Sequence, residues 1–261
     1  MQNTKSTVET KTVYKPVAFL FGTFLITWLC AGLMTYTDYN ADPVLFTVLD
    51  FLENASPLIC ALFLLKMSLL PLSALKHFLF GKTGHLSFNL IVLCLFAAQF
   101  FNFYCFRLPE SGCTVPVFLS VFAGQLLLGG GLEEAGWRGY LLPCFLKRWH
   151  ILTASAAVSL IWVLWHLPYF LLPGSLQSGE NLISYTLVGV VTGFILTAIY
   201  LLTKSVLLCM LFHSWQNTIV MTIPADTENP WFMLTFLLLG AVSVLLCILL
   251  QHTAMNFSAR I

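Results

Sequence analysis

Long apolar runs separated by short polar connections extend over almost the whole chain. A bilayer core of about 30 Å needs roughly 20 apolar residues for each helical span. By this measure the pattern predicts eight spans, at 16–37, 44–65, 88–106, 115–141, 151–172, 182–202, 205–223 and 231–250. The predicted fold class is therefore all-α, a polytopic transmembrane helix bundle.

Basic and acidic residues fall in alternate connections of this pattern. Ten of the twelve Lys and Arg residues lie before residue 16, in the 66–87 connection, in the 142–150 turn, at 204 and at 260. The other connections carry acidic residues and one arginine: Asp38, Asp42, Arg107, Glu110, Glu180, Asp226 and Glu228. Because cytoplasmic connections collect Lys and Arg, both termini are predicted to be cytoplasmic. Polar tails at 1–15 and 251–261 would then flank a single membrane domain at 16–250, with part of 66–87 forming an interfacial helix.

The composition supports a membrane protein and excludes a nucleic-acid-binding one. Hydrophobic residues make up 59% of the chain and charged residues 9%, with a mean hydropathy of +0.88. An average soluble domain is about a quarter charged. The net charge is +1, and no basic stripe with interleaved aromatic residues is present in the sequence.

The segment GGGLEEAGWRGYLLP, residues 129–143, places three charged residues inside a predicted span. Consecutive helical residues are about 100° apart, so Glu133 and Glu134 point in different directions. Glu134 and Arg138 are four residues apart on one face, where the guanidinium can neutralise the carboxylate. Glu133 has no such partner and is a functional candidate, because unpaired charges inside a membrane are expensive. The alternative is an architectural cluster that holds helices together.

Two of the six histidines, His166 and His213, lie inside apolar spans. His213 is followed four residues later by Asn217, so the imidazole and the amide share one helix face. A lone histidine in a membrane helix is more often a packing residue than a ligand. Two of them on separate spans, together with Glu133 and Asn217, favour a polar site. Pro168 is expected to kink the helix just after His166.

Three motifs occur in order: EExxxR as EEAGWR, an aromatic-xxx-His element as WVLWH, and HxxxN as HSWQN. Together they resemble the CPBP intramembrane protease family, which comprises the CAAX-processing (type II prenyl endopeptidase) enzymes and the Abi-like, bacteriocin-processing enzymes. The resemblance covers roughly residues 45–225. The block GLEEAGWRGYLLP is similar to the bacterial branch, so a bacterial cell membrane is the expected location. Trp162 stands where the family usually has Phe.

The resemblance implies hydrolysis of a peptide bond within the bilayer, near its cytoplasmic face, in a membrane-associated protein or peptide. It implies that Glu133 is the essential acid/base glutamate, that His166 and His213 are active-site histidines, and that Asn217 is the polar partner of His213. Glu134 and Arg138 would be supporting residues. The sequence does not select a substrate.

The chemistry of amide hydrolysis needs the same residue types. Water must be activated, an oxyanion stabilised and the leaving nitrogen protonated. Ser214 is adjacent to His213 and points about 100° away, so a Ser–His nucleophile is not expected. Glu133, His166 and His213 could form a two-His, one-carboxylate zinc set, although no HExxH motif is present. A water activated by glutamate without an obligatory metal is favoured, and zinc is the alternative cofactor.

Other polar and aromatic residues near the motifs receive weaker assignments. Asp50 and Glu53 lie near the end of the second predicted span, where water can reach them, and an interfacial role is expected. The tryptophans that cluster around the motifs are expected to wall a cavity: Trp137, Trp162, Trp165 and Trp215.

A non-enzymatic function is the alternative to the protease. An immunity factor, a regulatory protein or a carrier could use the same polar cluster for binding. A carrier would more naturally show an internal repeat and broken helices in both halves, and the sequence shows no such repeat.

Overall fold

The computed structural model describes residues 4–37, 42–65, 71–81, 86–109 and 112–251. The predicted C-terminal tail beyond residue 251 and the first three residues lie outside this part of the chain. The described residues form helices and no β-strand; the helices are α1 (Thr4–Met34), α2 (Pro43–Leu65), α3 (Leu72–Phe80), α4 (Leu86–Cys105), α5 (Val115–Leu127), α6 (Gly130–Gly136), η2 (Trp137–Leu141), α7 (Leu142–Leu146), α8 (Ile151–Trp165), η3 (Leu167–Phe170), α9 (Leu182–Thr203), α10 (Val206–Thr222) and α11 (Pro230–Leu249).

Within the described residues, six helical segments are long and apolar enough to cross a membrane: 15–34, 43–65, 88–105, 115–146, 182–203 and 230–249. The prediction of an all-α, multi-pass membrane bundle is therefore confirmed. Helices α8 and α10 occupy the predicted fifth and seventh spans but have only 15 and 17 residues. The total of eight spans and the cytoplasmic termini stay predictions.

Two predicted spans are broken rather than continuous. The 115–141 span is interrupted at Leu128 and Gly129 and passes through a π-helical turn, η2, immediately after the two glutamates. A run of three glycines at 129–131 favours the break, because glycine weakens a helix. The expected kink at Pro168 was wrong: α8 ends at Trp165, and His166 caps it before a short 3₁₀ turn. The ring of a proline disfavours the α-helical backbone for the residue before it, so an α-helix usually ends before a proline such as Pro168.

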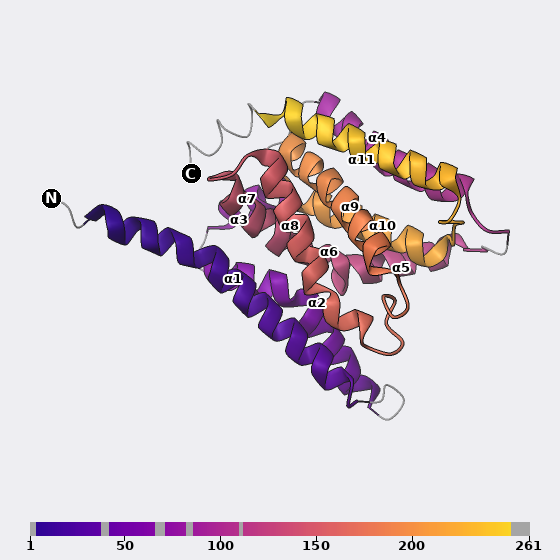
Figure 1. Cartoon of the computed structure of the whole chain (residues 1–261), viewed down its shortest axis with the longest axis horizontal. Helices are drawn as coiled ribbons and strands as arrows, with labels where there is room; N and C mark the ends of the chain where they lie inside the picture. Colours follow the sequence, from indigo (N-terminus) through magenta and orange to yellow (C-terminus); the bar gives the residue numbers. More distant parts are fainter. Residues whose placement is uncertain (1–3, 38–41, 66–70, 82–85, 110–111, 252–261) are drawn as a thin grey trace.

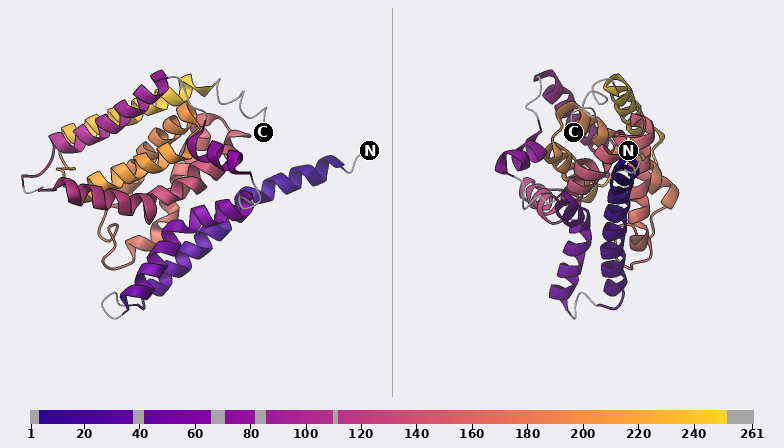
Figure 2. Two further views of the ribbon diagram at one scale, coloured as in Figure 1. Left: turned by 180° about the vertical axis from the view of Figure 1, so that it is seen from behind. Right: turned by 90° about the vertical axis from the view of Figure 1, so that its left-hand side faces the viewer.

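The helices are arranged with the motif segments in the middle of the bundle (Figure 1). Helices α1 and α2 form a hairpin on one side, and α4 and α11 run beside each other on the other (Figures 1 and 2). Between these pairs lie α6, α8, α9 and α10. The first part of α1 extends away from the other helices (Figure 2).

Aromatic residues and a chain of hydroxyl groups attach the α1–α2 hairpin to the motif segments. The Trp137 ring packs edge-on against Phe19 and Trp165, with centroid distances of 5.6 Å and 5.7 Å. The indole N–H of Trp165 donates to Thr27 Oγ1 at 2.8 Å, and Thr27 Oγ1 lies 2.7 Å from Ser56 Oγ. Direct interhelical hydrogen bonds of this kind help to hold membrane helices together, because an apolar helix surface packs against lipid tails almost as favourably as against another helix.

Close approach between α2 and α6 depends on Gly136. A Cβ atom at this position would lie 2.4 Å from Pro57 Cβ, so the two helices touch through their backbones. Small residues allow this close packing in membranes. The contact fixes the level of Glu133, three residues earlier, against α2.

Candidate active site

The six residues singled out from the motifs separate into two groups. Four of them line a cavity of about 1500 Å³: Glu133, His166, His213 and Asn217. Glu134 and Arg138 do not line it and are almost completely buried, with 0% and 2% of their surface exposed. The structure therefore places the four candidate catalytic residues at one cavity and the two supporting residues behind it.

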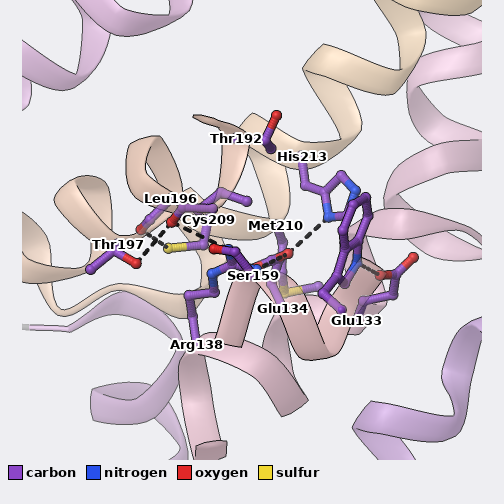
Figure 3. A network of polar contacts seen from close by, with 12 residues as sticks. Glu133, Glu134, Arg138, Ser159, Thr192, Leu196, Thr197, Cys209, Met210 and His213 are labelled. Carbon is purple, nitrogen blue, oxygen red and sulfur yellow. Dashed lines mark hydrogen bonds and ion pairs between the residues drawn. The ribbon is translucent and has the colours of Figure 1, made fainter. Parts of the chain in front are cut away.

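Glu134 lies inside a charged network. Its Oε1 atom accepts a hydrogen bond from Arg138 Nη1 at 3.0 Å and lies 2.8 Å from His213 Nδ1. Arg138 Nη2 also donates to the carbonyl of Gly193 at 3.4 Å. Figure 3 shows Glu134 between Arg138 and His213, whereas the Glu133 carboxylate beside them has a separate hydrogen bond. Burial of Glu134 and Arg138 together leaves neither charge uncompensated.

Glu133 has a different partner, on a different helix. The indole N–H of Trp162 donates to Glu133 Oε2 at 2.7 Å. Glu133 itself is 3% exposed. A hydrogen bond to a carboxylate is shorter and stronger than one between neutral groups, so this contact orients the side chain. Phe at position 162 could not donate it.

His166 leaves the end of α8 with one ring nitrogen already occupied. Its Nδ1 atom lies 2.9 Å from the carbonyl oxygen of Trp162. The ring packs edge-on against Trp162 at 4.2 Å and Trp165 at 4.6 Å, measured between centroids. The imidazole is therefore fixed by aromatic side chains, and its Nε2 atom has no hydrogen-bond partner among the described residues.

The hydrogen bonds of the two histidines indicate their tautomers. A carbonyl oxygen accepts from His166 Nδ1, and a carboxylate oxygen accepts from His213 Nδ1, so each Nδ1 carries the proton. In the neutral form each Nε2 then has a free electron pair. Both imidazoles can accept a proton through Nε2.

Asn217 and His213, both on α10, have their side chains next to Gly130 at the start of α6. A Cβ atom at Gly130 would lie 2.6 Å from Asn217 Nδ2 and 2.9 Å from His213 Nε2, so only glycine leaves room for both groups. The Asn217 amide donates one hydrogen bond to Gln125 Oε1 at 2.9 Å. Its second N–H remains available to a bound group.

The alternative zinc set does not match this arrangement. Within the described residues, no group of three or more His, Cys, Asp and Glu side chains could hold a metal ion. The Trp162 ring contacts both imidazoles, with centroid distances of 4.2 Å and 5.8 Å, and its N–H occupies Glu133 Oε2. The Trp162 indole thus contacts all three of these side chains.

Ser214 is not placed to act as a nucleophile. Its hydroxyl group donates to the carbonyl oxygen of Met210 at 2.8 Å, and the residue does not line the cavity. The wall formed by tryptophans is also smaller than expected. Trp162 lines the cavity, whereas Trp137 and Trp165 lie in the core and Trp215 packs against Phe96 and neighbouring rings.

Two residues at the cavity were missed or misassigned from the sequence. Glu53 is only 1% exposed and lines the cavity, so the expected interfacial role was wrong for this residue. Gln125, the partner of Asn217, was overlooked, although a polar amide two turns before Glu133 in an apolar span was a usable signal.

The cavity extends to the connections that carry acidic residues. Its lining includes residues 172–177 and 180, and also Thr227 and Glu228. The charge pattern predicts that these connections are not cytoplasmic, whereas the family resemblance implies hydrolysis near the cytoplasmic face. The two expectations therefore disagree about the side from which the cavity is reached.

Comparisons with known proteins support the resemblance. Residues 115–219 match the profile of the type II CAAX prenyl endopeptidase Rce1-like family. The chain is also 29% identical over 126 residues to CAAX prenyl protease 2 of Methanococcus maripaludis. The aligned segment covers 45% of this chain and 46% of that protein. The aligned part is thus about half the length of this relative.

The matched segment contains Glu133, Glu134, Arg138, His166, His213 and Asn217. The comparisons therefore confirm the resemblance to the CPBP intramembrane protease family, and residues 115–219 are the part of this integral membrane protein that is similar to the Rce1-like type II CAAX prenyl endopeptidases.

Proposed function

We propose that the protein is an intramembrane endopeptidase that hydrolyses a peptide bond in a membrane-associated protein or peptide. The observation that supports this most strongly is that a carboxylate, two imidazoles and an amide from α6, α8 and α10 line one cavity. At about 1500 Å³, the cavity is larger than a typical small-molecule pocket of roughly 300–1,000 Å³. It has room for an extended peptide segment.

The first step requires a base beside the scissile bond. Glu133 accepts a proton from a water molecule, and the water oxygen attacks the carbonyl carbon. The hydrogen bond from Trp162 holds one carboxylate oxygen, so the other oxygen is the proton acceptor. His166, with its free Nε2 electron pair, orients the water or shares the proton.

The tetrahedral intermediate carries a negative oxygen that must be stabilised. The second N–H of Asn217 donates to this oxygen, and His213 donates through Nε2 when that atom is protonated. Glu134 stabilises the imidazolium form of His213 through Nδ1, in the way that a buried carboxylate supports a catalytic histidine. The C–N bond then breaks as the proton on Glu133 passes to the leaving nitrogen, which gives a carboxylic acid and an amine; the acid proton then passes to the amine, so the products are a carboxylate and an ammonium group.

The proposed mechanism uses no metal ion; in support of this, no group of three or more His, Cys, Asp and Glu side chains among the described residues could hold one. CAAX-like processing at a C-terminus and processing of a leader or bacteriocin-type peptide are the candidate reactions. Both reactions hydrolyse a peptide bond close to a membrane.

The test is hydrolysis of a fluorogenic peptide library by the whole protein in nanodiscs, compared with Glu133→Ala purified in the same way. Mass spectrometry of the products identifies the cleaved bond. We expect the wild type to cleave a subset of peptides and the variant to cleave none. Equal cleavage by both proteins would indicate a contaminating protease and would contradict the proposal.

A further inference from the structure

A second carboxylate reaches the cavity from α2. Glu53 lies four residues before Pro57, and Glu133 lies three residues before Gly136, which packs directly on Pro57. Both carboxylates line the same cavity, so they stand on neighbouring helices on the same side of this contact. The proposed mechanism uses Glu133 and leaves Glu53 without a role.

Glu53 is buried without an ordinary partner. Its side chain is 1% exposed, and neither carboxylate oxygen has a hydrogen bond of normal geometry to a described residue, although the Tyr169 hydroxyl group faces it. A buried carboxyl group without a partner is destabilising, and a positive charge beside it relieves that penalty. The described residues that line the cavity include no Lys or Arg to supply the charge.

The route from the surface has the same sign of charge. Asp50, one turn before Glu53, and Glu180 and Glu228 in the connections all line the cavity, and all three are exposed. A cavity lined by one sign of charge concentrates ligands of the opposite sign. A positively charged segment would therefore be attracted from the opening towards Glu53.

Two buried amides point to a peptide rather than a small cation. Gln99 is 0% exposed and lines the cavity, and neither its Oε1 nor its Nε2 atom has a hydrogen-bond partner within the part of the chain that the structure describes. Gln216 also lines the cavity; its Nε2 atom donates to Thr192, and its Oε1 atom has no partner among the residues described. Unpaired buried donors and acceptors match the N–H and C=O groups of an extended peptide backbone.

We propose that the cavity takes an extended, positively charged peptide segment and that Glu53 binds a Lys or Arg side chain near the scissile bond. The inference rests on the proposed endopeptidase function and assigns its substrate class. Glu53 acts as a specificity residue, through a charge-assisted hydrogen bond made to the substrate in a water-poor site.

The experiment uses peptide series in which one Lys is moved through the four positions on each side of the cleaved bond. Each Lys peptide is paired with a norleucine peptide, which keeps the length and removes the charge. We expect at least one position where Lys raises kcat/KM about tenfold or more over norleucine. Glu53→Gln should remove most of that ratio, whereas Asp226→Asn, an exposed carboxylate that does not line the cavity, should preserve it.

Binding separates the failure of this inference from the failure of the proposed function. The same peptides are labelled and titrated against Glu133→Gln in nanodiscs, so Kd is measured without turnover. Tighter binding of the Lys peptides, lost on adding Glu53→Gln, supports the specificity role even if no library peptide is cleaved. Equal Kd values for Lys and norleucine at every position would overturn it. If Glu53→Gln is not stably folded, Asp50→Asn at the exposed part of the cavity replaces it, with a smaller loss expected.

Discussion

The indole N–H of Trp162 donates to Glu133 Oε2 at 2.7 Å, so a residue expected to wall the cavity also orients the proposed base. Trp162→Phe keeps an aromatic ring and removes this donor. We expect a folded protein with kcat lowered about tenfold, because a hydrogen bond to a charged group contributes roughly 1.5–3 kcal/mol. Steady-state kinetics on one cleaved peptide measure the effect, and an unchanged kcat would show that the hydrogen bond does not matter for the reaction.

His166 and Asn217 test whether the polar cluster works as one catalytic unit. Changing either residue to Ala should lower kcat by two or more orders of magnitude, since a general base or an oxyanion donor each contributes about 10²–10⁴-fold. The double variant should lose much less than the product of the single losses, because groups that act together are not additive. Near-wild-type function of the double variant, at equal protein levels, would favour the immunity or regulatory alternative.

Chelation tests the absence of a metal from the proposed mechanism. Incubation with 1,10-phenanthroline or EDTA, followed by removal of the chelator, should leave kcat within about twofold of the untreated protein. The structural reason is that no group of three or more His, Cys, Asp and Glu side chains among the described residues could hold a metal ion. Loss of activity that returns when zinc is added would contradict this mechanism and would require Glu133, His166 and His213 to rearrange.

Labelling in intact cells tests the side on which the cavity opens. After replacement of the eight native cysteines, a membrane-impermeant maleimide should label Ser178→Cys, next to the lining residue Gln177, and should not label Lys147→Cys. This result follows if the charge pattern sets the orientation. Labelling of both residues would contradict the eight-span topology. Labelling of Lys147→Cys alone would indicate that the cavity opens to the cytoplasm.

Hydropathy and helix spacing in the sequence predicted the helices and the contact between Glu134 and Arg138. Hydropathy identifies spans because an isolated backbone in lipid must satisfy its own hydrogen bonds. The pairing of Glu134 with Arg138 follows from their i,i+4 spacing, and the structure has it at 3.0 Å. The breaks after α5 and α8 were less predictable, since short glycine runs and prolines are often tolerated inside membrane helices.

Contacts between distant segments could not be read from spacing. His213 reaches Glu134 across 79 residues, and Trp162 reaches Glu133 across 29. Glu53 was placed near water because it lies close to the end of its span, but the folded chain leaves its side chain only 1% exposed. Depth along a helix is a property of the sequence, whereas coverage by neighbouring helices is a property of the fold.

The two adjacent glutamates provide the most direct measurement, because the structure gives them different partners. Thermal stability and kcat are measured for Glu133→Gln and Glu134→Gln in the same nanodiscs. Glu133→Gln should unfold like the wild type and hydrolyse no peptide, since it removes the base and keeps the size of the side chain. Glu134→Gln should lose about 3–5 kcal/mol of stability, because Arg138 is left buried without its counter-charge. Full activity of Glu133→Gln, together with a stable but inactive Glu134→Gln, would contradict the assignment of Glu133 as the base.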